Sequence, residues 1–300
     1  MNFTKPAINI QEQIDKLKGR GLEIKDEAKA ASYLSNISYY RLRAYTFPFQ
    51  DNATNLHPFT TKISFEEIIN LYVFDRKLRA LIFDAIEKIE ISLRTQIIYH
   101  WAIQYGSHWQ LDPALCRNGV GFATNYSKLT AEIGRSKETF IAHYNNKYTN
   151  PSDPPCWMSF EVCSFGLLSM IFSNLKTGTQ KKAVVHYYGL KDESVLESWM
   201  HSFSNIRNVC AHHGRLWNRR FTAHIKLPTY PKFNFIQDKT ILKYKIYAAM
   251  ACIQYILNII SPTCGFKNKL LELMNDCPHA NEKEMGFPKN WQDDPFWKEA

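Results

Sequence analysis

The sequence lacks any hydrophobic run as long as the roughly 18 residues that a membrane-spanning helix requires, although 45% of its 300 residues are hydrophobic. The opening stretch, Met1 to Gly21, mixes charged and polar side chains without the apolar core of a secretion signal. An aromatic content of 14% indicates that the chain can bury enough surface to fold. We therefore expect a folded cytoplasmic protein with no membrane partner.

Cysteine is sparse and poorly placed for a cross-linked or metal-bound fold. The seven cysteines are an odd number, widely scattered, and form no C-x-x-C pair, which favours reduced thiols. Cys277 and His279 are close, but two ligands do not complete a tetrahedral site. The signatures of NTPases, dinucleotide-binding enzymes, esterases and zinc proteases are also missing. We expect no metal and no cofactor.

Acidic residues are missing from one stretch of forty residues, Ser198 to Gln237, although the whole chain contains 28 of them. The net charge of the chain is +9. The basic residues of this acid-free window are Arg207, Arg215, Arg219, Arg220, Lys226 and Lys232. Such a window is either a solvated basic face or a binding surface for a polyanion, and its length favours a polyanion such as RNA.

Helical periodicity is present almost throughout and predicts an all-α fold. Ser64 and Glu67 form a capping box ahead of a periodic stretch that ends near Tyr105. This stretch is one very long helix or two helices joined near Phe83. Further helices are expected near Tyr126 to Tyr148, from near Trp157 through Glu161 to about Leu175, from Asp192 to His213, and from Asp238 to Ser261.

Two glycine positions carry specific expectations. The pair Gly119 and Gly121 marks a loop ahead of the helix near Tyr126. Gly214 is expected directly after a helix end, in the left-handed conformation that glycine adopts without steric cost.

The segment Arg207-Asn208-Val209-Cys210-Ala211-His212 contains the residue types that RNA cleavage requires. A histidine can take the proton from a ribose 2′-hydroxyl or protonate the leaving oxygen, and an arginine can hold the phosphate. Asn208 adds a donor, and this division of labour needs no metal. Five helical positions rotate by about 140°, so Arg207 and His212 converge only if the helix end tightens or unwinds. His213 is the alternative catalytic histidine.

The chain resembles the abortive-infection (Abi) family of bacterial phage-resistance proteins, in the AbiD/AbiF-like branch of the HEPN superfamily. The matching segments are residues 37–42, 74–79, 157–166, 206–219 and 285–291. The segment 206–219, which contains the Arg-Asn…His-His block, carries most of the specificity. The resemblance implies a HEPN-like helical bundle, an R-x4-6-H ribonuclease motif and a dimer that brings two motifs together.

Together, the motif and the resemblance predict a metal-independent endoribonuclease toxin of phage defence that leaves 2′,3′-cyclic phosphate ends. An RNA or protein antitoxin is the partner expected to restrain it. We expect one integrated fold with an N-terminal helical segment (1–62), a HEPN-like core (63–262) and a C-terminal helix and tail (263–300).

Several residues outside the motif are candidates for supporting parts. Glu161 is expected either to orient Arg207 or a catalytic histidine, or to be a partly exposed helix carboxylate. Arg215, Trp217, Arg219, Arg220 and Lys226 are expected to bind RNA, with Trp217 stacking on a base.

A homodimer would supply the second acid–base group that one motif lacks. We expect Trp199, Phe203, Ile206 and Leu216 to hold its interface. Two rival functions remain open: an RNA- or protein-binding module without catalysis, and a HEPN protein that modifies, or is modified by, a nucleotide-transfer partner.

Overall fold

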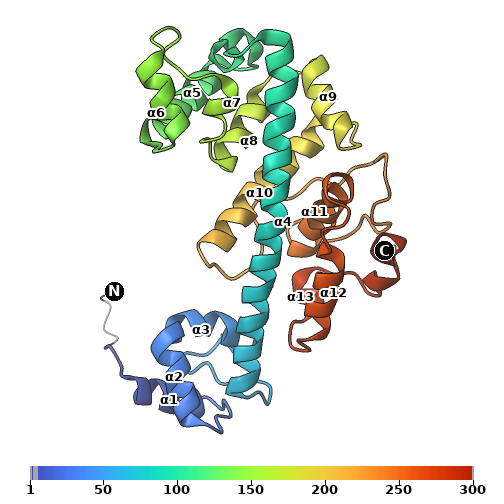
Figure 1. Ribbon diagram of the computed structural model, residues 1–300. Helices are drawn as coiled ribbons and strands as arrows, with labels where there is room; N and C mark the ends of the chain where they lie inside the picture. Colours follow the sequence, from blue (N-terminus) through green and yellow to red (C-terminus); the bar gives the residue numbers. More distant parts are fainter. Residues whose placement is uncertain (1, 3–5, 299–300) are drawn as a thin grey trace. The chain divides into compact units, whose positions relative to one another are not determined.

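The computed structural model describes residues 2 and 6–298, and it confirms the all-α class (Figure 1). Within that part of the chain, β structure is confined to three isolated bridges, Glu23–Ser64, Gln50–Phe59 and Cys116–Leu175. The chain forms two compact units. The first comprises the residues up to Leu78 together with Leu271–Asn281, and the second comprises Arg79–Leu270 with the residues from Glu282 onward.

Among its described residues the first unit contains three short α-helices, whose starts follow from their capping residues. They are α1 (Ile10–Gly19), α2 (Glu27–Ile37) and α3 (Tyr39–Thr46). Asn9 and Glu12 form a reciprocal capping box on α1, and the Asp26 carboxylate accepts the Lys29 amide at 2.8 Å on α2. Such caps satisfy amide groups that the first helical turn leaves without partners.

Helix α4 (Phe65–Tyr105) is one helix of 41 residues, not two joined near Phe83 (Figure 1). It begins at the predicted capping box, in which Glu67 accepts the Ser64 amide at 2.6 Å. No Gly or Pro interrupts it, and its apolar stripe is continuous, so nothing in the sequence breaks the helix. The boundary between the two units lies within α4, after Leu78.

The second unit surrounds α10, the helix that carries the Arg207–His212 motif. Its longer helices are α5 (Gly119–Arg135), α6 (Thr139–Lys147), α8 (Phe165–Asn174), α9 (Thr179–Tyr187), α10 (Glu193–Ala211) and α11 (Ile246–Ile260). Helix α10 packs against α8, α9 and α11. Helix α11 is buried on every side from Ile246 to Leu257, which makes it the central helix of this core.

Four predicted helix boundaries in this unit were wrong. The single helix expected near Tyr126 to Tyr148 is divided into α5, which ends at Arg135, and α6, which begins at Thr139. Helix α5 begins at Gly119, because Asn118 caps it, and Gly121 lies where a Cβ would meet the Asn174 side chain at 3.1 Å. The helix expected around Glu161 is split into α7 (Cys156–Ser159) and α8 by a turn. The last long helix starts at Ile246, not near Asp238, whose carboxylate instead closes a local turn onto the Thr240 amide at 2.8 Å.

The C-terminal segment packs against α11 through aromatic rings. It contains the short helices α13 (Glu282–Met285), η4 (Trp291–Asp293) and α14 (Pro295–Lys298). The indole of Trp297 donates to the Tyr247 hydroxyl at 3.0 Å, and Trp291 and Trp297 meet edge to face at 5.3 Å. Burial raises the pKa of Tyr247. Among the described helices, none is both long and apolar enough to cross a membrane.

Candidate functional site

Helix α10 positions the motif because its start is capped and its inner face is deeply buried. The Asp192 carboxylate accepts the Ser194 amide at 2.8 Å. Trp199, Phe203 and Ile206 have at most 2% of their surface exposed, and Leu216 beyond the helix end has none. These four residues therefore belong to the core of their own chain. The prediction that they hold a dimer interface was wrong.

The C-terminal end of α10 is a Schellman motif whose left-handed residue is a histidine. The His213 amide donates to the Cys210 carbonyl at 3.1 Å, and the Gly214 amide donates to the Val209 carbonyl at 2.8 Å. His213 has φ of 56°, whereas Gly214 does not have a positive φ. The left-handed conformation was expected at Gly214, but His213, the residue before it, adopts it instead. A left-handed conformation is uncommon in residues other than glycine, although histidine adopts it more often than most, as asparagine and aspartate do. Such conformations cluster at functional sites.

Gly214 is required by space and not by its φ angle. A Cβ on Gly214 would lie 3.3 Å from the Val209 carbonyl oxygen and 3.2 Å from the Val209 side chain. The Gly214 carbonyl accepts a hydrogen bond from Nη1 of Arg79 at 3.4 Å, and the Arg79 side chain is buried. Arg79 thus ties the end of α10 to α4, which fixes the backbone beside both histidines.

Arg207 lies on a different side of α10, in a mixed-charge recess. Its guanidinium carbon lies 5.7 Å from the centre of the Phe83 ring on α4. The recess is open, with a volume of about 830 Å³, and Glu90, Arg94 and Glu161 line it together with Arg207. Arg94 binds Glu90 at 2.8 Å. Neither histidine of the motif lines this recess.

The helix stays regular through Ala211, so Arg207 and His212 do not converge within one chain. The His212 amide still donates to the Asn208 carbonyl at 3.0 Å, four residues back, and the helix does not unwind before this point. Five positions of regular helix separate the two side chains by about 140° of rotation. His212 instead shares its face with Asn208, Asn205 and His201, which precede it by four, seven and eleven positions.

Glu161 is exposed and lies in a turn, not on the helix that was expected around it. Its side chain is 57% exposed, lies in the turn after α7, and approaches Arg94 at 3.9 Å. It lines the same recess as Arg207. An exposed pair at this distance contributes little to stability, and Arg94 is instead fixed by Glu90 and by the Cys163 carbonyl.

The residues that were predicted to bind RNA differ in how far they are exposed and do not form one surface. Trp217 is only 1% exposed, so it cannot stack on a base, and this prediction was wrong. Arg215 is half-buried. Lys226 is exposed, and its backbone amide and carbonyl are bound by Ser198 and by the Trp199 indole. Arg219 and Arg220 are exposed, and both contribute to the lining of one cavity.

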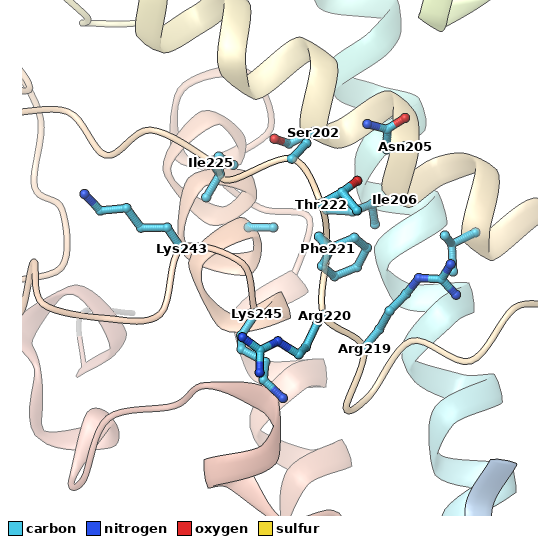
Figure 2. Close-up of a pocket in the computed structure, with 13 residues that line it drawn as sticks. Ser202, Asn205, Ile206, Arg219, Arg220, Phe221, Thr222, Ile225, Lys243 and Lys245 are labelled. Atoms are coloured by element: carbon cyan, nitrogen blue, oxygen red, sulfur yellow. The ribbon is translucent and has the colours of Figure 1, made fainter.

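That cavity, here named the basic pocket, lies between α10, residues 219–225 and the start of α11 (Figure 2). Its volume is about 240 Å³. Four basic side chains line it: Arg219, Arg220, Lys243 and Lys245. Among the described residues that line it there is no carboxylate. Lys243 and Lys245 were missed by sequence reasoning because they lie beyond the acid-free window, and charge composition alone does not show that the chain returns to α10.

The sequence was compared with protein families, curated proteins and solved structures. A family model described as Abi-like protein matches residues 32–218, which is more than half of the chain and includes α10 with its whole motif. No curated protein and no solved structure matches. The match confirms the resemblance to abortive-infection proteins.

Proposed function

Because this chain belongs to the family of Abi-like proteins, whose name indicates abortive-infection defence against phage, we propose that it is an RNA-cleaving toxin of that defence. The main support for the proposal is the arrangement of residues at the C-terminal end of α10. Two adjacent exposed histidines follow Arg207, and the second is held in a left-handed conformation by a Schellman motif. Acid–base groups that are exposed and rigidly placed beside basic residues suit cleavage of a polyanion.

The proposed reaction needs one proton acceptor, one proton donor and one cation. A histidine takes the proton of the ribose 2′-hydroxyl, and O2′ then attacks the neighbouring phosphorus. The bond from phosphorus to O5′ breaks, O5′ receives a proton from a second histidine, and a 2′,3′-cyclic phosphate remains. We assign the main acid–base part to His212 and a supporting part to His213. Arg207 and Asn208 would neutralise and bind the phosphate.

We further propose that the active species is a HEPN-like homodimer. Within one chain Arg207 faces the mixed-charge recess while His212 faces away from it. A two-fold axis places the same patch of both chains together, so that Arg207 of one protomer can meet His212 of its partner. An RNA or protein antitoxin that covers the end of α10 would restrain such a toxin.

The separation of Arg207 and His212 also favours one alternative, an RNA-binding module without catalysis. Incubation of the purified protein with total cellular RNA in EDTA distinguishes the two functions. We expect cleavage that persists in EDTA. The 2′,3′-cyclic phosphate ends should resist both ligation and an ordinary phosphomonoesterase, and should become ligatable after the cyclic phosphate is opened and the phosphate is removed. Intact RNA that nevertheless co-migrates with the protein would favour the binding module.

A further inference from the structure

A short loop, residues 227–231, is held at both of its ends. Before the loop, the Lys226 carbonyl accepts a hydrogen bond from the Trp199 indole at 2.7 Å. After the loop, the Lys232 amide donates to the Gly189 carbonyl at 2.8 Å. A segment that is already held in one conformation loses little further entropy when it binds a ligand. The loop is therefore a preorganised part of the protein surface.

The chain that follows the loop is anchored in the core of the second unit. The Phe233 ring lies against Gly189, where a Cβ would meet a ring carbon at 2.6 Å, so this contact requires a glycine. Phe235 is buried and meets the Tyr255 ring edge to face at 5.6 Å. These contacts fix the position of the loop on the second unit.

Tyr230 lies in this loop with 73% of its surface exposed, which is more than any other aromatic residue described in the second unit. Pro231 follows it, and a residue before proline is largely restricted to extended conformations. An exposed ring by itself indicates no function, because single apolar side chains are common on protein surfaces. The charges around Tyr230 distinguish it from such residues.

Exposed lysines lie beside the rings of this segment. The Lys191 ammonium lies 5.8 Å from the centre of the Tyr230 ring, and the Lys232 ammonium lies 5.3 Å from the centre of the Phe233 ring. Tyr230 and Lys232 both belong to the acid-free window. Asp192 follows Lys191, but its carboxylate is engaged as the cap of α10. Aromatic rings among cations are typical of surfaces that bind single-stranded nucleic acid, because the rings stack on bases and the cations bind phosphates.

The acid-free window follows α10 from its C-terminal end back toward its start. Near the end of α10, Nη1 of Arg219 lies 3.6 Å from the position that a Cβ on Gly214 would occupy. Near its start, the Ser198 hydroxyl accepts the Lys226 amide at 3.0 Å. These two contacts are separated by about 24 Å of helix, at 1.5 Å per residue. An RNA strand that is cut beside the histidines can therefore continue along the window to Tyr230.

From these observations we infer that Tyr230 stacks on a base of single-stranded RNA, several nucleotides from the cut bond. Lys191 and Lys232 bind phosphates of the same strand, and they bind different phosphates because they lie beside different rings. The class of ligand rests on the proposed function, whereas the stacking contact does not require cleavage. Tyr230 thus takes the part that was expected of Trp217, which is buried.

The test measures binding of the full chain to a labelled RNA strand of about 12 nucleotides by fluorescence anisotropy. The strand carries 2′-fluoro riboses, which cannot be cut by attack of O2′. Tyr230→Ala is expected to bind roughly tenfold more weakly, because one base loses its stacking partner. Tyr230→Phe keeps the ring and should bind within about twofold of the wild type. Tyr40→Ala, which removes an 85% exposed tyrosine outside the acid-free window, is the matched control and should leave binding unchanged.

A second strand of the same length, made of abasic sugar–phosphate units, separates stacking from support of the loop. Without bases there is nothing for the ring to stack on, so wild type and Tyr230→Ala should bind this strand equally. Lys191→Ala combined with Lys232→Ala should weaken the binding of both strands. It should also lower the slope of log affinity against log salt by about 1.4, at about 0.7 for each phosphate contact with a single strand.

Each outcome decides the assignment. Wild-type affinity of folded Tyr230→Ala for the strand with bases would overturn it, even if the wild type cleaves RNA. An equal loss on the abasic strand, or the same loss in Tyr230→Phe, would also overturn it, because the ring would then not act by stacking. A wild type that cuts no RNA but shows the expected pattern would support the stacking and remove the proposed function. A wild type that binds neither strand would overturn both.

Discussion

The two sides of α10 differ in how their charges are balanced. On the side of Arg207, the recess also contains Glu90, Arg94 and Glu161, and the ion pair between Arg94 and Glu90 measures 2.8 Å. On the side of the basic pocket, cations line the cavity without a carboxylate among the described residues. The charged residues that line the recess are thus of both signs, whereas those that line the pocket among the described residues are all basic. Arg207 and His212 are close in the sequence, but the rotation of α10 places their side chains on different sides of the helix.

The largest effect should come from His212→Ala. Loss of a general acid or base lowers the cleavage rate by about 100-fold or more, and the fold should be unaffected because His212 is exposed. Cleavage of a defined RNA under single-turnover conditions measures the effect. His186→Ala, which replaces an exposed histidine on α9, is the control. Unchanged cleavage in a folded His212→Ala protein refutes the assignment, and loss confined to His213→Ala transfers the part to His213.

A mixing experiment tests whether the two sides of α10 meet across a dimer. Arg207→Ala and His212→Ala proteins should each be inactive alone. After mixing, half of the dimers are mixed and each has one complete site, so activity should recover to about a quarter of the wild-type value. A wild-type dilution series followed by mass in solution provides the companion measurement. No recovery, together with activity per chain that stays constant in a monomeric protein, would exclude the shared site.

The close packing at the C-terminal end of α10 can be tested by replacing each of two glycines with alanine. Gly214→Ala should destabilise the protein by about 1–3 kcal/mol, because the new Cβ would crowd the Val209 carbonyl at 3.3 Å. The same change at Gly166 in α8, where nothing lies within 4 Å, should be neutral or stabilise by about 0.5 kcal/mol. Urea denaturation compares them. Equal stability of the two variants would show that the end of α10 adjusts freely, contrary to the close packing described above.

The smallest effect concerns the start of α10. Hydrogen bonds from the side chain and backbone of Ser194 lower the pKa of Asp192 in the folded protein. A lowered carboxylate pKa contributes stability above the unfolded pKa, and this contribution is lost as pH falls through the folded pKa. Asp192→Asn keeps the cap but not the charge. Wild type should therefore lose more stability than the variant between about pH 6 and pH 3; parallel curves would contradict this.

Local sequence signals predicted most of the helices and some of their ends. Ser64 with Glu67 caps the long helix that was expected after it, and Asp192 caps α10, because a cap depends on residues within one turn. Asp238 failed as a cap, because the same carboxylate geometry also closes a turn that does not continue into a helix. An aspartate before a polar segment is compatible with both a helix cap and an isolated turn, so the local sequence alone does not decide which one forms.

Apolar residues near the motif show a second limit. Trp199, Phe203, Leu216 and Trp217 were assigned to an interface or to base stacking, but all four are buried in their own chain. Hydrophobicity shows that a side chain leaves water, and it does not show which surface covers it.

The sequence by itself determined the all-α class, the family, and the run of basic residues around an arginine and two histidines. These depend on composition, periodicity and residues close in the chain. Only the tertiary structure decided that Arg207 faces a mixed-charge recess and that His213 rather than Gly214 takes the left-handed conformation. It also brought Lys243 and Lys245 into the lining of the same cavity as Ser202, about forty residues earlier in the chain. The physical reason is that a cavity forms from surfaces that meet only when the core packs, and the charge of each lining residue acts over the distances that this packing sets.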